Sequence, residues 1–432
     1  MHKDEAGVLL LRATSLSYIM LMRNCTIFKL SNGIRVVHQY IPTTNIVHCG
    51  IILGIGSRDE IVSNQGIAHF WEHMAFKGTK KRTSLDIIKS LDSVGGELNA
   101  FTDKEKIVFY ASVRDQYFER AVDVLTDITF QSTFPEKELE KERGVILEEM
   151  AMYFDNPDDA LQDELEALIF KGHSLGMNIL GNEQTVRTFK KRDFVSFFKE
   201  HADNRRIVFS CVGNISLEHV EQIAKLYLEG KPHFKSTVKR KKFATYKQRE
   251  EILQRGVKQT RCAFGRDAYP LLSQNRIPFF LLTNILGGPG MNSRLSLSVR
   301  ERYGLVYAID AQYMAFADTG MFAIYFGTEP KQVGRCMILV RRELDRLCNT
   351  PLSSRELASS KEQIKGQLAM SEENNQGLMI MMGRAVIDLD RVPLLEEVYE
   401  KINEVDASLL QRIACEMFDE NKLSSLIIEP KH

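Results

Sequence analysis

The sequence predicts an α+β protein of two homologous domains, each an antiparallel sheet with helices packed mainly on one face. Its 432 residues exceed the usual size of one domain. Short apolar strand patterns and longer helical patterns occur in both halves. The second half also echoes the first, because residues 139–142 after Phe134-Pro135 resemble residues 357–360 after Thr350-Pro351, and each segment leads into a long helix.

Strand and helix signals in the first half begin after residue 24. Asn32-Gly33 separates two short strand patterns and predicts a hairpin. The strands are predicted at residues 26–30, 34–38, 47–55, 97–102, 107–113 and 206–213. Helices are predicted at residues 84–94, 115–130, 137–153, 158–169, 191–201 and 217–228, in addition to the helix described next.

Residues 66–76, Gly-Ile-Ala-His-Phe-Trp-Glu-His-Met-Ala-Phe, predict a helix that is apolar around most of its circumference. His69, Glu72 and His73 fall on one face, and a helix with apolar residues on its other faces is normally buried. Two buried imidazoles one turn apart can chelate a cation, usually zinc. Glu72 then faces the metal as a general base acting on bound water would. The alternative is a pair of satisfied core histidines, but the order His-x-x-Glu-His favours a metal.

The helix predicted at residues 137–153 carries two carboxylates within its apolar stripe. The stripe consists of Leu139, Ile146, Met150 and Tyr153. Glu142 and Glu149 lie two turns apart within it, whereas Glu148 points to the far side. Both glutamates could extend to water at the helix edge. Beside a helix with two histidines, the simpler interpretation is that one carboxylate ligates the metal and the other orients a histidine.

The second half contains no counterpart of the histidine motif. Beyond His233 the only histidine is His432, and the position that corresponds to Glu149 in the echo is Gln367. We therefore expect a duplicated domain that lost its chemistry and was kept for substrate binding or for closing a chamber. The run Met379-Ile380-Met381-Met382 predicts helix core rather than a functional surface.

A basic, irregular segment separates the two halves and includes Lys239-Arg240-Lys241-Lys242. A nucleic-acid patch is one interpretation, with Phe243 and Tyr246 stacking on bases. A solvated linker is favoured, because the run is short and the total charge is balanced. The expected divisions are an N-terminal extension at residues 1–24, a first domain at residues 25–230, a linker at residues 231–250 and a second domain at residues 251–432.

Composition narrows the class of protein further. The 57 basic and 57 acidic residues cancel, so no nucleic-acid partner is expected. Seven scattered cysteines without a Cys-x-x-Cys pair predict reduced thiols and argue against a thiolate zinc site. No stretch approaches the length of about 20 apolar residues that spans a bilayer, so no membrane partner is expected. The first residues are too acidic for a signal or transit peptide, which predicts a cytoplasmic protein.

The two glutamate-containing motifs resemble those of a known family, the M16 metallopeptidases, which comprise the pitrilysin, insulin-degrading enzyme and mitochondrial processing peptidase group. The family's His-x-x-Glu-His and downstream Glu-x6-Glu match His69, Glu72, His73, Glu142 and Glu149. The resemblance implies that His69, His73 and Glu149 bind one Zn2+ per chain, that Glu72 is the catalytic base and that Glu142 supports a ligand. The spacing of the motifs is similar to that of the short processing-peptidase subfamily, and the similarity covers most of the chain.

The resemblance also marks residues for substrate binding. It implies that Asn99, Ala100 and Phe101 form an edge strand to which a substrate peptide adds its own backbone. From the residues alone, an ordinary strand is equally consistent. Arg300 and Tyr307 are similar to the family's arginine–tyrosine motif, which contacts the substrate and helps polarise its scissile carbonyl. A surface ion pair is the alternative for Arg300.

Together these patterns predict a zinc-dependent endopeptidase that cleaves extended or unfolded peptides by attack of a metal-activated water, as a processing peptidase does. The alternative is a non-catalytic core or scaffold subunit of a larger complex, but all five motif residues are intact. A purely structural zinc would need a fourth protein ligand, for which we see no candidate. The resemblance further implies a clamshell chamber completed by a homodimer, in which Arg300 and Tyr307 serve the zinc site of the neighbouring subunit.

Overall fold

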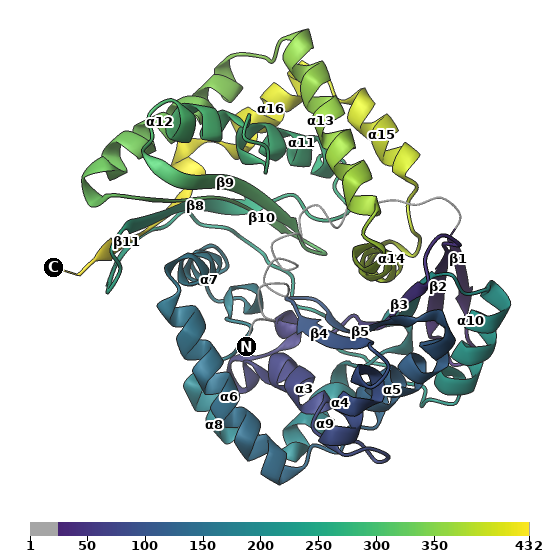
Figure 1. The fold of residues 1–432 in the computed structure, drawn as a ribbon. Coiled ribbons are helices and arrows are strands. Elements are labelled where there is room, and N and C mark those ends of the chain that lie inside the picture. The colour runs from purple at the N-terminus through teal and green to yellow at the C-terminus, as the bar shows by residue number, and fades with distance from the viewer. Residues whose placement is uncertain (1–24, 432) are drawn as a thin grey trace.

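The computed structural model describes residues 25–431, which form two sheet-containing domains facing one another (Figure 1). The expectations for residues 1–24 and for His432 lie outside this range. All seven cysteines are free, as predicted. None of the helices within the described range has the length and apolarity needed to span a bilayer.

The first sheet has six strands in the order β1-β2-β6-β3-β5-β4. The strands are β1 (Thr26–Lys29), β2 (Arg35–Tyr40), β3 (Ile46–Leu53), β4 (Glu97–Thr102), β5 (Ile107–Arg114) and β6 (Ile207–Gly213). β1 and β2 form the predicted hairpin, and Gly33 in its turn has a φ of 95°, which favours glycine. β2 and β6 pair in parallel while the other neighbours are antiparallel, so the sheet is mixed rather than wholly antiparallel.

The first domain contributes helices that cover one face of this sheet, except that the helix at residues 157–169 packs against the second sheet. They are α3 (Ile67–Ala75), α4 (Ser84–Asp92), α5 (Phe118–Phe130), α6 (Glu136–Asp155), α7 (Pro157–Ile169), α8 (Glu183–Thr188), α9 (Lys191–His201) and α10 (Leu217–Ala224). The core between helices and sheet contains Phe70, Phe109 and Phe209. All the predicted helices are present. α8 was not predicted, although Asn182 caps its first turn by accepting from the Thr185 N–H.

The second domain has a five-stranded sheet in the order β7-β11-β8-β10-β9. Its strands are β7 (Glu250–Arg255), β8 (Thr260–Ala268), β9 (Val306–Ala315), β10 (Gly320–Thr328) and β11 (Ser424–Pro430). Its helices are α11 (Arg276–Gly287), α12 (Val333–Asn349), α13 (Ser354–Glu372), α14 (Asn375–Leu389), α15 (Leu395–Glu404) and α16 (Ala407–Met417).

The two domains have the same topology and are homologous. The order β2-β6-β3-β5-β4 repeats as β7-β11-β8-β10-β9, with the parallel pair at the same place. α6 begins at Glu136 and α13 at Ser354, so the predicted echo of residues 139–142 and 357–360 falls at the same positions of two equivalent helices. α7 and α14 follow at equivalent positions. The duplication inferred from the sequence therefore extends over the sheet and the helices that follow it.

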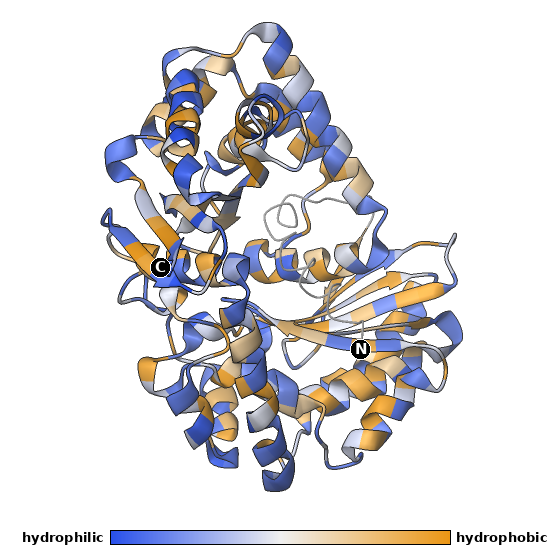
Figure 2. Ribbon diagram, turned by 60° about the vertical axis from the view of Figure 1, so that its left-hand side comes forward, coloured by the Kyte–Doolittle hydropathy of each residue, from blue (hydrophilic) through white to orange (hydrophobic). Residues whose placement is uncertain are grey.

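The equivalent helices α7 and α14 are exchanged between the domains. Leu161 and Leu165 of α7 pack with Met321 of the second sheet, while Met379 of α14 packs with Val208 of the first sheet. Figure 1 shows α14 against one face of the first sheet, on the side opposite to helices such as α4 and α5 of the first domain. The predicted Met-rich helix core is thus confirmed. Each sheet is covered on both faces, which agrees with the largely hydrophobic strands of the first sheet in Figure 2.

The segment between the domains is irregular, as predicted, but parts of it are not solvated. Arg240 forms an ion pair of 2.7 Å with Asp59, and Phe243 packs edge-on against Phe170 with ring centroids 5.0 Å apart. The Tyr246 hydroxyl donates to a backbone carbonyl oxygen of the second domain at 2.8 Å. The expectation of a solvated linker is therefore wrong for these three residues. The segment passes through the domain junction, where Arg240 compensates buried carboxylates and both aromatic rings make contacts within the chain.

Candidate metal centre

The N-terminus of α3 is fixed by Gly66 and Glu60. Gly66 has a φ of 92°, and a Cβ added to it would lie 2.6 Å from the Cα of Gly181, so only glycine fits. The Glu60 carboxylate accepts from the backbone N–H groups of Gly66 at 2.8 Å and Ala68 at 2.9 Å. A carboxylate here satisfies free N–H groups and complements the helix dipole. The start of the helix is therefore held in place three residues before His69.

α3 and α6 bring two histidines and one glutamate together. Within the described part of the chain, His69, His73 and Glu149 are the one group of at least three potential metal ligands, and one atom of each lies within 4.8 Å of the others. Glu149 Oε2 lies 3.7 Å from His69 Nε2 and 3.4 Å from His73 Nε2. This buried oxygen has no hydrogen-bond partner among the described residues. Two imidazole nitrogens and an unsatisfied carboxylate oxygen are a donor set that fits zinc.

Glu142 approaches the other nitrogen of His73. Its Oε2 lies 3.2 Å from His73 Nδ1, and its Oε1 accepts from Lys77 Nζ at 2.7 Å. Burial raises the pKa of Glu142, but the hydrogen bonds from His73 and Lys77 outweigh burial and lower it. Glu142 therefore fixes the proton of His73 on Nδ1 and leaves Nε2 directed toward Glu149. The two glutamates, whose roles the sequence pattern left open, take different positions around the same histidine.

The pKa values of the two histidines reflect their surroundings. Burial, together with the neighbouring His73, lowers the pKa of His69 to about 4. Burial also opposes the charged form of His73, but Glu142, Glu149 and Glu72 raise its pKa to about 9. The carboxylates thus create a negative field in which a cation is stabilised.

Glu72 lies on the same face of α3, and β4 holds its side chain. Thr102 Oγ1 donates to Glu72 Oε2 at 2.6 Å. Burial raises the pKa of Glu72 to about 7, against the effects of His73 and this hydrogen bond. A carboxylate with this pKa can both accept and release a proton near neutral pH. The exposed Glu148 takes no part, as predicted from its position on the helix.

Sequence reasoning missed Thr102 and Lys77. Thr102 follows Leu98 and Ala100 at the strand period of two, and these two residues pack into the core shared with α3. This alternation was the available signal that Thr102 points toward the histidine helix. Lys77 lies four residues after His73, a spacing that places two residues on one side of a helix. Neither pattern alone identifies a bond to a glutamate on another element.

The residues predicted to bind substrate occupy the edge of the first sheet. β4 pairs only with β5 in the described chain, so Asn99, Ala100 and Phe101 lie on an edge strand. Asn99 is exposed, and the other two are partly buried. An edge strand next to α3 leaves backbone groups that an extended peptide can pair with.

Arg300 and Tyr307 lie in the other domain. Arg300 is in a π-helical turn, Ser296–Glu301, and its Nε lies 3.5 Å from Glu301 Oε1. Tyr307, at the start of β9, is 89% exposed. In the described chain neither forms a hydrogen bond or ion pair with the histidine cluster, and α3 and β9 belong to opposite halves of the molecule (Figure 1). A single chain therefore does not bring the two motifs into contact.

The second domain has a pair of amide side chains at the position equivalent to the histidine–glutamate cluster. α11 and α13 pack together as α3 and α6 do. Asn284 Nδ2 of α11 donates to Gln367 Oε1 of α13 at 2.8 Å, and Gln367 is the residue that corresponds to Glu149. Amides in place of imidazole and carboxylate explain why this domain has no comparable group of ligands in the range described.

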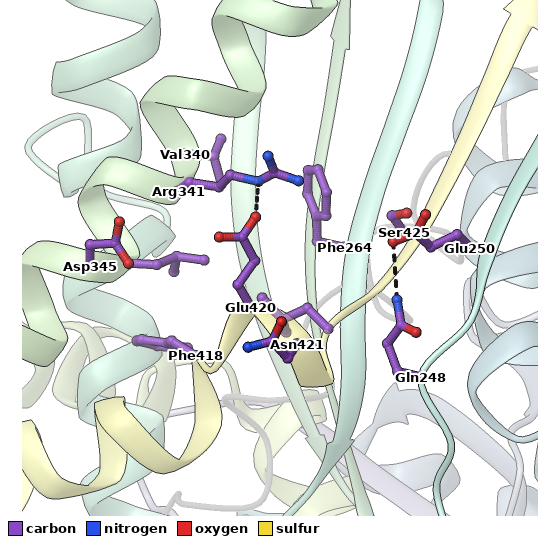
Figure 3. A pocket seen from close by; sticks show the side chains of 12 residues that line it. Gln248, Glu250, Phe264, Val340, Arg341, Asp345, Phe418, Glu420, Asn421 and Ser425 are labelled. Carbon is purple, nitrogen blue, oxygen red and sulfur yellow. Dashed lines mark hydrogen bonds and ion pairs between the residues drawn. The ribbon is translucent and has the colours of Figure 1, made fainter.

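A pocket of about 320 Å³ lies elsewhere in the second domain (Figure 3). It is formed between α12 and the strands β7 and β8, with Phe264 and Phe418 in its wall. An ion pair of 2.6 Å between Arg341 and Glu420 spans part of it. None of its lining residues belongs to the histidine cluster or to the predicted substrate-binding residues.

The fold and the histidine–glutamate cluster define a class of protein, the metallopeptidases with an inverted His-x-x-Glu-His motif. Comparison with known proteins shows that the chain belongs to one family of this class, peptidase family M16. Residues 35–183 match the model described as insulinase (peptidase family M16), and residues 188–364 match the peptidase M16 inactive domain.

Relatives of similar length support the assignment. The chain is 35% identical to the uncharacterized zinc protease YmxG of Bacillus subtilis over 92% of this chain and 96% of that protein. It is 31% identical to an uncharacterized zinc protease of Rickettsia bellii over 94% and 97% of the two chains.

Two solved structures share the fold. One is a peptidase M16 inactive domain from Pseudomonas fluorescens, with a TM-score of 0.86 and 18% identity, and the match covers 95% of this chain and 99% of that chain. The other is a protease from Helicobacter pylori, with a TM-score of 0.85 and 19% identity, and the match covers 95% of this chain and 100% of that chain.

Proposed function

We propose that the protein is a zinc-dependent endopeptidase that cleaves extended or unfolded peptides, in the manner of processing peptidases. The observation that carries this proposal is the convergence of His69, His73 and Glu149 beside Glu72. Because the described residues contain one such group, we assign one zinc ion per chain, held by these three side chains. The relatives are named zinc proteases, which supports the choice of metal.

The geometry supports the roles that we assign to the surrounding residues. A bound zinc ion supplies a water of lowered pKa and polarises the scissile carbonyl. Glu72 accepts the proton of the attacking water and returns it to the leaving amine, for which a pKa of about 7 is well suited. Glu142 keeps the Nδ1 proton of His73 in place, so that Nε2 remains a ligand.

Substrate binding is assigned to the strand edge beside the cluster. A peptide that pairs with the backbone of Asn99, Ala100 and Phe101 must be extended, so folded proteins are poor substrates. Arg300 and Tyr307 act on the site of a neighbouring subunit in a homodimer. Their position in the opposite domain and the exposure of Tyr307 support this arrangement.

Cleavage profiling tests the function directly. Purified, zinc-loaded protein is incubated with a peptide library made from a denatured proteome and with a stably folded domain and its unfolded variant. We expect internal cleavage of library peptides and of the unfolded variant, and little cleavage of the folded domain. A protein that holds zinc but cleaves no peptide would contradict the proposal, and equal cleavage of the folded and unfolded domains would contradict the substrate class.

A further inference from the structure

Thr102 connects the edge strand β4 to the carboxylate of Glu72. Its side chain is buried, with 5% exposure, and its Oγ1 donates to Glu72 Oε2 at 2.6 Å. Leu98 and Ala100 lie on the same face of the strand and pack into the core of the first domain. Thr102 is therefore the polar member of a strand face that otherwise makes apolar contacts.

A glutamate side chain has three rotatable bonds, so its carboxylate needs partners if it is to keep one orientation. The hydrogen bond from Thr102 occupies one carboxylate oxygen, Oε2, and restricts the rotation of the group. The other oxygen, Oε1, remains to accept a proton. A buried hydrogen bond to a charged group is among the stronger ones in a protein, so its loss leaves the carboxylate poorly held.

We propose that Thr102 is a positioning residue for the reaction, which it serves by orienting the carboxylate of Glu72 toward the attacking water. This inference rests on the proposed peptidase function and adds a residue to it. Thr102 directly follows Phe101, the last residue of the proposed substrate-binding stretch. One backbone segment thus sets the position of the substrate and, through the Thr102 hydroxyl, that of the base.

A set of threonine variants separates positioning from a structural role. Thr102→Val keeps the shape of the side chain and removes the hydroxyl, whereas Thr102→Ser keeps the hydroxyl. Thr129→Val is the matched control, because Thr129 is buried in α5 and its hydroxyl has no hydrogen-bond partner among the described residues. For each protein, kcat, KM and zinc content are measured with one peptide substrate of the wild type.

We expect Thr102→Val to lower kcat by about 10- to 100-fold, the range for a lost hydrogen bond to a charged group, with KM and zinc content unchanged. Thr102→Ser should return kcat to within about threefold of the wild type, and Thr129→Val should match the wild type. If the valine variant does not fold, Thr102→Ala replaces it as the variant without a hydroxyl.

Two results would overturn the inference while leaving the peptidase function intact. One is a Thr102→Val enzyme with the kcat of an active wild type. The other is a Thr102→Val enzyme whose KM is raised or whose zinc content is lowered, with a defect that Thr102→Ser does not restore. That result would assign a structural role to Thr102. A wild-type protein that binds zinc but cleaves no peptide would overturn the proposed function itself and, with it, this inference.

Discussion

His73 and Glu149 come from different helices, and their Nε2 and Oε2 atoms lie 3.4 Å apart without a hydrogen bond that satisfies the oxygen. This arrangement directs a buried carboxylate oxygen at the Nε2 atom of His73, because Glu142 binds the opposite side of the ring. Buried polar atoms normally have partners, and a shared cation satisfies both groups at once.

The first prediction concerns the amount of zinc. Purified wild-type protein should contain one zinc ion per chain, because one group of three ligands converges in the described structure. Changing both His69 and His73 to alanine removes two of the three ligands and should abolish binding. Metal analysis of the purified proteins makes the comparison, and full zinc content in the double variant would place the metal elsewhere.

Glu142 should influence zinc affinity without binding the ion. Glu142→Gln weakens the bond to His73 Nδ1 and should lower zinc affinity by about 10- to 100-fold, the usual effect of losing a group that orients a ligand. Glu148→Gln is the matched control, because Glu148 lies on the same helix but is exposed. Affinities are measured by competition with a chelator. Equal zinc affinities for the two variants would show that Glu142 does not support zinc binding.

The domain junction should depend strongly on Arg58. Its guanidinium forms an ion pair of 2.6 Å with Glu105 of the first domain, a second with Asp318 of the other domain, and all but 1% of the side chain is buried. Arg58→Ala leaves the buried Glu105 carboxylate with Arg240, 3.5 Å away, as its remaining counter-charge, and should lower the free energy of unfolding by about 3 kcal/mol, the low end of the range for a broken buried ion pair.

Urea denaturation measures this loss against Arg187→Ala, which removes an exposed ion pair with Glu183 and should cost less than about 1 kcal/mol. Similar losses in both variants would mean that water reaches the junction and screens the charges of Arg58.

The proposed homodimer should have sites completed across its interface. Glu72→Gln and Arg300→Ala chains should each be nearly inactive alone. A heterodimer of the two keeps one site in which both residues are intact, so co-expression should recover up to about half of the activity per dimer if the sites act independently.

Size-exclusion chromatography and two different affinity tags verify the heterodimer. Verified heterodimers without recovered activity would assign both motifs to the site of one subunit. A fully active monomer would remove the need for a partner.

The local patterns of the sequence were sufficient to predict much of this fold. The His69-x-x-Glu72-His73 motif and the positions of Glu142 and Glu149 depend on the helical period, which is visible in the residues themselves. The similarity of residues 139–142 and 357–360 predicted the duplication, because it too is visible in the residues themselves. The Met379 helix was correctly expected to be buried, but its partner, the sheet of the other domain, could not be predicted because periodicity shows which face is buried and not what covers it.

The missed contacts share a physical origin. Arg240 lies in a basic run that is typical of solvated linkers, and it is buried by contacts with residues far away in the sequence, among them Asp59 and Glu105. Thr102 and Glu72 are likewise joined through packing of a strand against a helix. Single residues with ordinary local patterns acquire such roles from long-range contacts, which one sequence does not reveal.

The central claim, that Glu72 is the general base of a zinc endopeptidase, is tested most directly by comparing Glu72→Gln with the wild type. Glutamine keeps the shape of the side chain and leaves His69, His73 and Glu149 in place, but it cannot accept the proton. Turnover of a peptide substrate and zinc content are measured on the same preparations. The account predicts unchanged zinc content and turnover lower by at least about 100-fold. Near-normal turnover by the zinc-loaded variant would contradict it.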